Sequence, residues 1–288
     1  MRKGLPLFIL LSLALMGCQK AVRSGRPLVI ATIRPYELLL RDLLGPDFEV
    51  RTFIPANASP HTFNPGPRDI RSLRDADLVL SNGFGLETDL ERAFSGLGEK
   101  HLRAEDLLRD TVADPAANPH IWLSPMLMQK LCHRLSGKLR ETFPAHSEEI
   151  ANRAVELVST LAALDQRITS ERDSLGATPL ITFHDSFHWF NRSYRIDNLG
   201  SVQSSPGREP TPRELASLGG QIRANRVRAI CVEPQMDSRS AEVLAREFDL
   251  LVIELDPLGF IFAARTLPEL IATNWDRMKQ TWEPEASQ

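Results

Sequence analysis

The sequence predicts an α/β fold in which two small lobes with parallel sheets are joined by one long rigid helix. Short apolar runs alternate with helical segments along most of the chain, as they do in α/β proteins. The longest helical pattern, residues 145–174, lies between two halves of similar make-up. A chain of 288 residues, 42% of them hydrophobic, is long enough to bury a substantial core. The alternative is a single domain built around one long core helix.

Residues 1–17 are predicted to form a signal peptide and are left out of the fold. Two basic residues precede Leu5–Met16, an apolar stretch of 12 residues that is short for a membrane-spanning helix. It leads into Leu15-Met16-Gly17-Cys18, which resembles a bacterial lipobox, so we expect cleavage before Cys18 and lipidation of that cysteine. Acyl chains would anchor the exported protein to the membrane, facing the periplasm or the extracellular side, through a tether at residues 18–27. An ordinary secretory signal, with Cys18 incidental, is the alternative.

The N-terminal lobe is predicted at residues 28–142. Short apolar runs predict strands at residues 28–32, 49–54 and 78–80. Helical patterns between and after them predict helices at residues 36–44, 69–74, 87–94 and 125–140.

The linking helix is predicted within residues 143–175. Apolar residues recur there at alternating steps of four and three, which places them on one face of a helix: Ile150, Ala154, Leu157, Leu161, Leu164 and Ile168. Thirty residues at 1.5 Å each would make a rod of roughly 45 Å. We interpret it as a spine between the lobes.

The C-terminal lobe is predicted at residues 176–288. Thr211 and Pro212 form a typical helix start, with Thr211 as the N-cap residue and Pro212 in the first turn. The remaining pattern predicts strands at residues 179–183, 229–233 and 250–255, and helices at residues 185–192, 238–248 and 267–282.

Composition and the absence of certain motifs argue against several classes of function. The net charge of −3 comes without a basic stripe, so nucleic acid is not an expected partner. Sequence motifs for hydrolases, phosphate-binding loops and paired-cysteine sites are absent, and we predict no enzyme activity. Cys132 and Cys231 fall in different lobes, and we expect both to be buried and free rather than joined in a disulfide.

Four potential metal ligands stand beside turn residues, about 60 to 70 residues apart: His61, His120, His184 and Asp256. They could meet only in the folded chain, and three imidazoles with one carboxylate suit zinc. His184 and Asp256 directly follow predicted strands, and the carboxyl ends of parallel strands are where such sites form. The sequence therefore predicts a metal site built by tertiary structure.

The other histidines are weaker candidates. His188 competes because it lies four residues after His184 and would share its helix face if both were helical. His101, His133 and His146 lie in charged stretches and are expected to be solvated.

In these motifs the chain resembles the metal-binding solute-binding proteins of ABC importers, which deliver zinc or manganese to a membrane permease. The resemblance is nearly continuous from about residue 28, and its motifs occur in order at residues 59–67, 76–87, 118–125, 182–187, 209–211, 232–235 and 255–259.

The resemblance implies that a metal binds in the cleft between the lobes, with His61 and His120 from the first lobe and His184 and Asp256 from the second. It implies an ABC permease as partner and a monomer as the working form. Histidine at position 184 resembles zinc-selective members, whereas manganese-selective ones tend to carry glutamate. One departure is that residues 98–118 contain a single histidine, His101, where many zinc-uptake members carry a long histidine-rich loop.

We therefore interpret the chain as a carrier of Zn²⁺. Four protein ligands saturate a tetrahedral zinc and leave no position for an activated water, which argues against a zinc hydrolase. Proton competition for the imidazoles is expected as the pH falls through about 6.5. The alternatives are a carrier of Mn²⁺ or Fe²⁺ on the same scaffold and, less favoured, a metal-stabilised surface adhesin.

Overall fold

The computed structural model describes residues 25–114, 118–176, 178–203, 207–237 and 239–282. The predicted signal peptide, the lipidation site Cys18 and most of the tether lie outside these residues. Among the helices that are described, none is both long enough and apolar enough to cross a membrane.

The first sheet contains four parallel strands in the order β2-β1-β3-β4. The strands are β1 (Leu28–Ala31), β2 (Glu49–Thr52), β3 (Leu78–Ser81) and β4 (His101–Arg103). The two central strands, β1 and β3, are almost fully buried, as expected for strands covered on both faces. Strand β4 was not predicted, because this short edge strand, His-Leu-Arg, has no apolar run.

Helices flank this sheet. They are α1 (Arg34–Leu44), α2 (Pro67–Asp75), α3 (Glu91–Phe94), α4 (Ala104–Leu108) and α5 (Pro125–Thr142). The predicted helix 87–94 starts instead with a 3₁₀ turn, Thr88–Leu90. Helix α1 ends at Gly45, whose φ of 72° favours glycine, and a Cβ atom there would lie 2.7 Å from the guanidinium of Arg153.

The second sheet repeats this arrangement with the order β6-β5-β7-β8, again all parallel. Its strands are β5 (Leu180–Thr182), β6 (Asn198–Ser201), β7 (Ala229–Val232) and β8 (Leu251–Glu254). Strand β6 was also missed, since Asn-Leu-Gly-Ser lacks the branched and aromatic residues typical of strands. Both missed strands lie at an edge of their sheet.

The helices of the second lobe are α7 (His188–Ser193), α8 (Pro212–Asn225), α9 (Arg239–Phe248) and α10 (Leu267–Met278). The predicted start of α8 is confirmed: Thr211 accepts a hydrogen bond from the backbone N–H of Glu214, and Glu214 reaches back to the N–H of Thr211. Helix α7 starts three residues later than predicted, so His184 belongs to the bend after β5.

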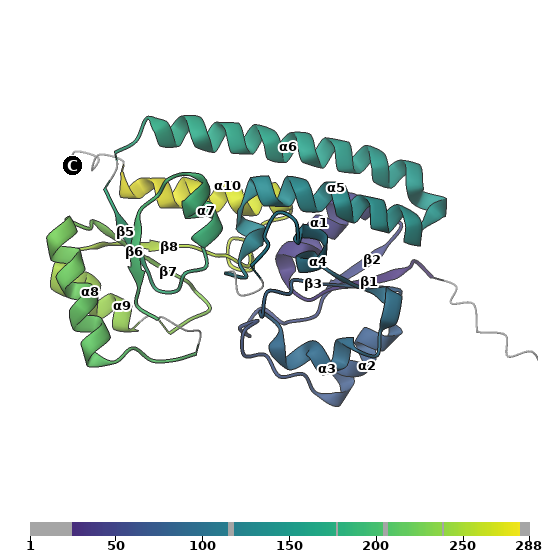
Figure 1. Ribbon diagram of the computed structural model, residues 1–288, viewed down its shortest axis with the longest axis horizontal. Helices are drawn as coiled ribbons and strands as arrows, with labels where there is room; N and C mark the ends of the chain where they lie inside the picture. The colour runs from purple at the N-terminus through teal and green to yellow at the C-terminus, as the bar shows by residue number, and fades with distance from the viewer. Residues whose placement is uncertain (1–24, 115–117, 177, 204–206, 238, 283–288) are drawn as a thin grey trace, which may run out of the picture.

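One long helix, α6 (Ser147–Asp173), runs along both lobes, with α10 beside it (Figure 1). Its predicted apolar stripe is confirmed, because all six residues are buried. The helix has 27 residues rather than thirty, since a 3₁₀ turn, Pro144–His146, precedes it. Each sheet lies within one of the outer segments, 28–142 and 176–288, and we retain this division of the chain as a proposal.

Contacts between the lobes hold them together on the side of α10. Helix α10 packs against α1 as well as α6. The Arg34 side chain donates hydrogen bonds to the carbonyl oxygens of Gly259 (3.0 Å) and Ala264 (2.9 Å). Trp122 Nε1 donates to the carbonyl oxygen of Pro257 at 2.8 Å. Cys132 and Cys231 are both buried and free, as predicted.

The stripe on α6 allows a direct test. Leu161→Ala removes a fully buried side chain, so we expect the free energy of unfolding to fall by about 2–5 kcal/mol. Val155→Ala on the same helix changes a side chain that is 71% exposed and should alter it by less than about 0.5 kcal/mol. Urea unfolding followed by circular dichroism measures both, and equal losses would contradict the packing described here.

Candidate metal centre

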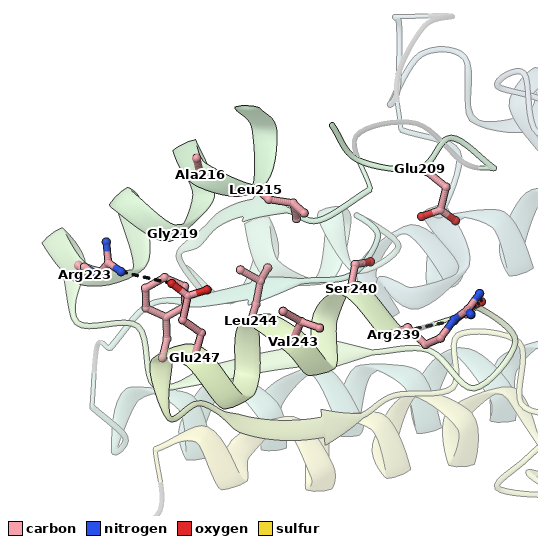
Figure 2. A pocket seen from close by; sticks show the side chains of 12 residues that line it. Glu209, Leu215, Ala216, Gly219, Arg223, Arg239, Ser240, Val243, Leu244 and Glu247 are labelled. Carbon is pink, nitrogen blue, oxygen red and sulfur yellow. Dashed lines mark hydrogen bonds and ion pairs between the residues drawn. The ribbon is translucent and has the colours of Figure 1, made fainter. Parts of the chain in front are cut away.

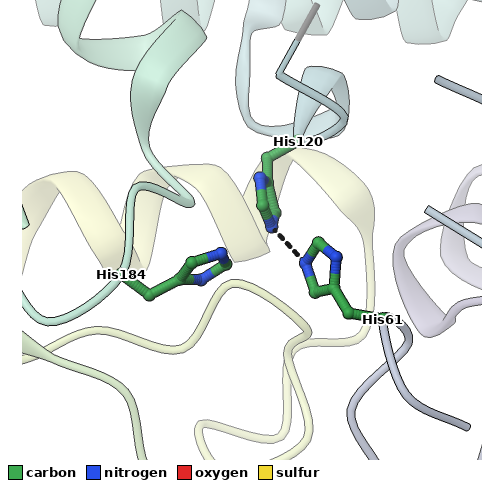
Figure 3. Close-up of side chains that lie close together, drawn as sticks. All are labelled: His61, His120 and His184. Atoms are coloured by element: carbon green, nitrogen blue, oxygen red, sulfur yellow. Dashed lines mark hydrogen bonds between the residues drawn. The ribbon is translucent and has the colours of Figure 1, made fainter. Parts of the chain in front are cut away.

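Three of the four predicted ligands converge in the cleft between the lobes. His61 lies in the turn after β2, His120 directly before the 3₁₀ turn Ile121–Leu123, and His184 in the bend after β5. Each offers a ring nitrogen, and these three atoms lie within 4.8 Å of one another (Figure 3). The ring centroids are 4.7–5.2 Å apart.

The spacing of the closest pair suits a metal. The Nε2 atoms of His61 and His120 lie 3.1 Å apart. Two nitrogens bound to one tetrahedral zinc, at the usual 2.0–2.1 Å, would lie about 3.3 Å apart. A zinc ion would thus need only a small adjustment of these two rings.

The orientation of His120 is fixed by Asn118. Its Oδ1 atom accepts from the backbone N–H of His120 (3.0 Å) and contacts ring Nδ1 at 2.8 Å. Because a backbone N–H only donates, the amide oxygen must face His120, and Nδ1 must carry the proton. The lone pair of His120 is therefore on Nε2, the atom that faces His61.

His184 is oriented by a carboxylate that sequence reasoning did not single out. Its Nδ1 atom lies 3.2 Å from Oε1 of Glu233, a residue that directly follows β7 and is 7% exposed. Ser186 donates its hydroxyl to the same oxygen at 2.9 Å. A carboxylate that accepts Nδ1–H fixes the ring tautomer and makes the other nitrogen a better ligand. Glu233 had appeared only within a family-like motif, and nothing in the sequence linked it to His184.

Two of the imidazoles are uncharged at neutral pH. Burial lowers the pKa of His61 to about 3, and the nearby His184 adds to the effect. Burial, followed by the neighbouring histidines, lowers the pKa of His120 well below its usual range. These two rings thus present lone pairs rather than positive charge. Proton competition at these two residues begins at lower pH than the value of about 6.5 that the sequence suggested.

The structure does not bring Asp256 into this group of ligand atoms. Its carboxylate is fully buried and accepts five N–H hydrogen bonds, from the side chain of Gln235 and the backbones of Leu258, Gly259, Ile261 and Phe262. These donors compensate the cost of burying the charge. They also order the loop whose residues Pro257 and Leu258 line the cavity beside the histidines.

The cavity at the three histidines is small. Its volume of about 20 Å³ is enough for a single water-sized particle. Pockets for organic ligands are commonly about 300–1,000 Å³. The cavity therefore accommodates an ion and excludes an organic solute.

The remaining histidines do not join the cluster. His188 bonds Asp185 instead, with Nδ1 3.1 Å from Oδ2. His133 is exposed, as expected. The expectation for His101 was wrong: it stacks on Phe94, contacts Ser81 at 2.7 Å, and burial lowers its pKa to about 4.

A second group of possible ligand atoms lies on the surface, formed by Asp47, His146 and Glu149. His146 is only partly solvated, because its ring packs edge-on against Phe48. Arg153 already holds Glu149 through two contacts of 2.9 Å, and the start of α6 presents the positive end of a helix dipole. Both features oppose a cation.

The second lobe also carries a groove of about 680 Å³ between α8 and α9 (Figure 2). Leu215, Val243 and Leu244 form its apolar part, and the ion pair between Arg223 and Glu247 (3.4 Å) lies at its rim. Its lining includes neither histidine nor cysteine, and among the described residues its carboxylates form no group of potential ligand atoms.

Comparisons with known proteins match nearly the whole chain to one family. The family described as zinc-uptake complex component A, periplasmic (ZnuA), matches residues 29–281. The chain is 26% identical over 280 residues to the high-affinity zinc uptake system protein ZnuA of Haemophilus ducreyi, covering 86% of this chain and 89% of the relative.

Solved structures share the fold. A crystal structure of ZnuA matches with a TM-score of 0.79 and 22% identity, covering 90% of this chain and 100% of the other. The solute-binding protein FpvC of Pseudomonas aeruginosa in complex with Mn²⁺ matches with a TM-score of 0.77 and 23% identity, covering 90% and 99%.

The lowered pKa of His61 predicts how the metal-free protein responds to acid. Between about pH 6.5 and pH 3, His61 is protonated in the unfolded chain but stays unprotonated in the folded protein. The free energy of unfolding therefore falls as the pH falls through this window. His61→Gln removes this contribution and should give a flatter curve, and His133→Gln, at an exposed position, is the control. Urea unfolding at several pH values measures the slopes, and identical slopes for the wild type and His61→Gln would refute the assignment.

The contact between Glu233 and His184 predicts a loss of metal affinity. Glu233→Gln keeps the shape but removes the negative charge that Nδ1 of His184 faces, so affinity for a divalent transition metal should drop about 10–100-fold. Asp237→Asn, in the exposed ion pair with Arg239, is the matched control. Competition with a metal-binding dye measures both, and equal affinities would mean that Glu233 does not orient the ligand.

Proposed function

Because this chain belongs to the family of periplasmic zinc-uptake components (ZnuA), we propose that it captures zinc outside the cytoplasm and delivers the ion to an ABC permease. The family consists of metal-binding solute-binding proteins and not of enzymes. Its members deliver metal to an ABC permease. The identity of the ion and the handover by this particular chain are the parts that we propose.

The observation that carries the proposal is the cluster of three imidazoles at the junction of the lobes. Nitrogen ligands of this type suit zinc, whereas sites rich in carboxylate and water suit manganese. The name of the Haemophilus relative, a high-affinity zinc uptake protein, supports the same choice. A carrier of Mn²⁺ or Fe²⁺ remains the second candidate, favoured by the manganese complex of the structural neighbour FpvC.

We assign the ligands as His61, His120, His184 and Asp256. For Asp256 to serve, one of its oxygens must exchange a backbone N–H partner for the ion. The other nearby carboxylate, Glu233, already accepts from His184 and Ser186 through Oε1. Its position supports a role in orienting His184, which leaves the fourth place to Asp256.

We further propose that the chain is exported as a monomer and anchored by lipid at Cys18. The lipobox-like motif Leu15-Met16-Gly17-Cys18 supports this. Such anchoring would keep the metal-binding lobes near the permease while leaving them in the aqueous phase.

Metal stoichiometry tests the proposal. The chain without its targeting segment would be stripped of metal, then exposed to equal Zn²⁺, Mn²⁺ and Fe²⁺ without oxygen, and analysed for bound elements. We expect one zinc per chain, lost or sharply reduced in His184→Ala and retained in His188→Ala, whose ring lies outside the cluster.

Stoichiometric manganese or iron would change the proposed cargo but keep the site. Equal zinc in His184→Ala and the wild type would refute the site itself. Absence of retained metal in the wild type would refute the proposed function.

A further inference from the structure

The metal ligands come from two lobes, so something must hold the two sets in register. The side chain of Asn118 is positioned to do this, because the two ends of its amide face different lobes. Its oxygen accepts from His120 in the first lobe, and its Nδ2 atom donates to the backbone carbonyl of Asp185 at 2.8 Å. Asp185 is the residue next to His184.

The orientation of this amide is determined by its partners. The backbone N–H of His120 is only a donor, and the carbonyl of Asp185 is only an acceptor. A flipped amide would lose both hydrogen bonds. The single favourable orientation therefore links a ligand of one lobe to the peptide beside a ligand of the other.

Asp185 is itself held in place by contacts within the second lobe. Within the second lobe, the Asp185 carboxylate accepts from Asn198 Nδ2 (3.1 Å) and contacts His188 Nδ1 (3.1 Å). Trp189, on α7, adds a second inter-lobe bond by donating Nε1–H to the backbone carbonyl of Asn118 at 2.7 Å. Asn118 is thus held through both its side chain and its main chain.

We propose that Asn118 is a positioning residue that latches the lobes together and sets how long the ion is retained; the inference rests on the proposed function for its cargo. We call the contacts of Asn118 with Asp185 and Trp189 the inter-lobe latch. An ion bound by histidines of both lobes leaves when they separate, so the latch acts on dissociation.

Two substitutions break the latch in different ways. Asn118→Asp keeps an oxygen facing His120 but places a second oxygen opposite the carbonyl of Asp185, replacing attraction with repulsion. Trp189→Phe keeps an aromatic ring but removes the bond to the Asn118 carbonyl. Asn225→Asp makes the same chemical change as Asn118→Asp, but at the end of α8, where the Asn225 amide donates to the carbonyl of Gln221 in the same helix; it serves as the control.

The first measurement is the rate of zinc release into excess chelator, beside the rate of zinc uptake. We expect release to accelerate about tenfold or more in Asn118→Asp and by a smaller factor in Trp189→Phe, with Asn225→Asp like the wild type. A change confined to uptake, or unchanged release in both latch variants, would overturn the proposal.

The second measurement needs no metal. Hydrogen exchange of residues 184–193 in the metal-free protein should be faster in Asn118→Asp, although the substitution is in the other lobe. Unchanged hydrogen exchange in this variant would overturn the proposed latch, regardless of the zinc release rates. A wild type that takes up no zinc would refute the proposed function, and the exchange measurement would still decide whether Asn118 joins the lobes.

Discussion

Three imidazole rings approach within about 5 Å of one another, and the surrounding structure keeps two of them, His61 and His120, uncharged. Protonated rings at that separation would repel, and burial disfavours the charged form. The pKa values of His61 and His120 are lowered accordingly. Each lobe contributes its ligands from turns that follow a strand or precede a helix, so the rings meet only when both sheets are in place.

The polar residues around the histidines have different structural roles. Asn118 and Glu233 each face an Nδ1 atom, which leaves Nε2 of His120 and of His184 for a ligand. Asn118 also reaches across the cleft, whereas Glu233 acts within its own lobe. The Asp256 carboxylate accepts hydrogen bonds from the loop that follows it, and this loop contacts the first lobe through Pro257 and Gly259. Asn118 thus contributes both to ring orientation and to the contact between the lobes, Glu233 to ring orientation, and Asp256 to the order of its loop.

Much of this could be predicted from the sequence, and the exceptions have physical reasons. The α6 stripe, the cap of α8 and the central strands follow from local periodicity and local hydrogen bonding, which a sequence displays directly. Strands β4 and β6 depend on pairing with a neighbouring strand rather than on their own composition. The three histidines could be anticipated from chemistry and family resemblance. The partners Asn118 and Glu233 could not, because a hydrogen bond between distant residues exists only in the folded chain.

The small volume beside the histidines has a consequence for metal speciation. A space of about 20 Å³ admits an ion only after its hydration shell has been shed, and it cannot admit an ion that still carries an organic chelator such as citrate. A protein built in this way responds to the thermodynamic activity of the free ion and not to the total metal in its surroundings. Small chelators of the same ion then become its competitors.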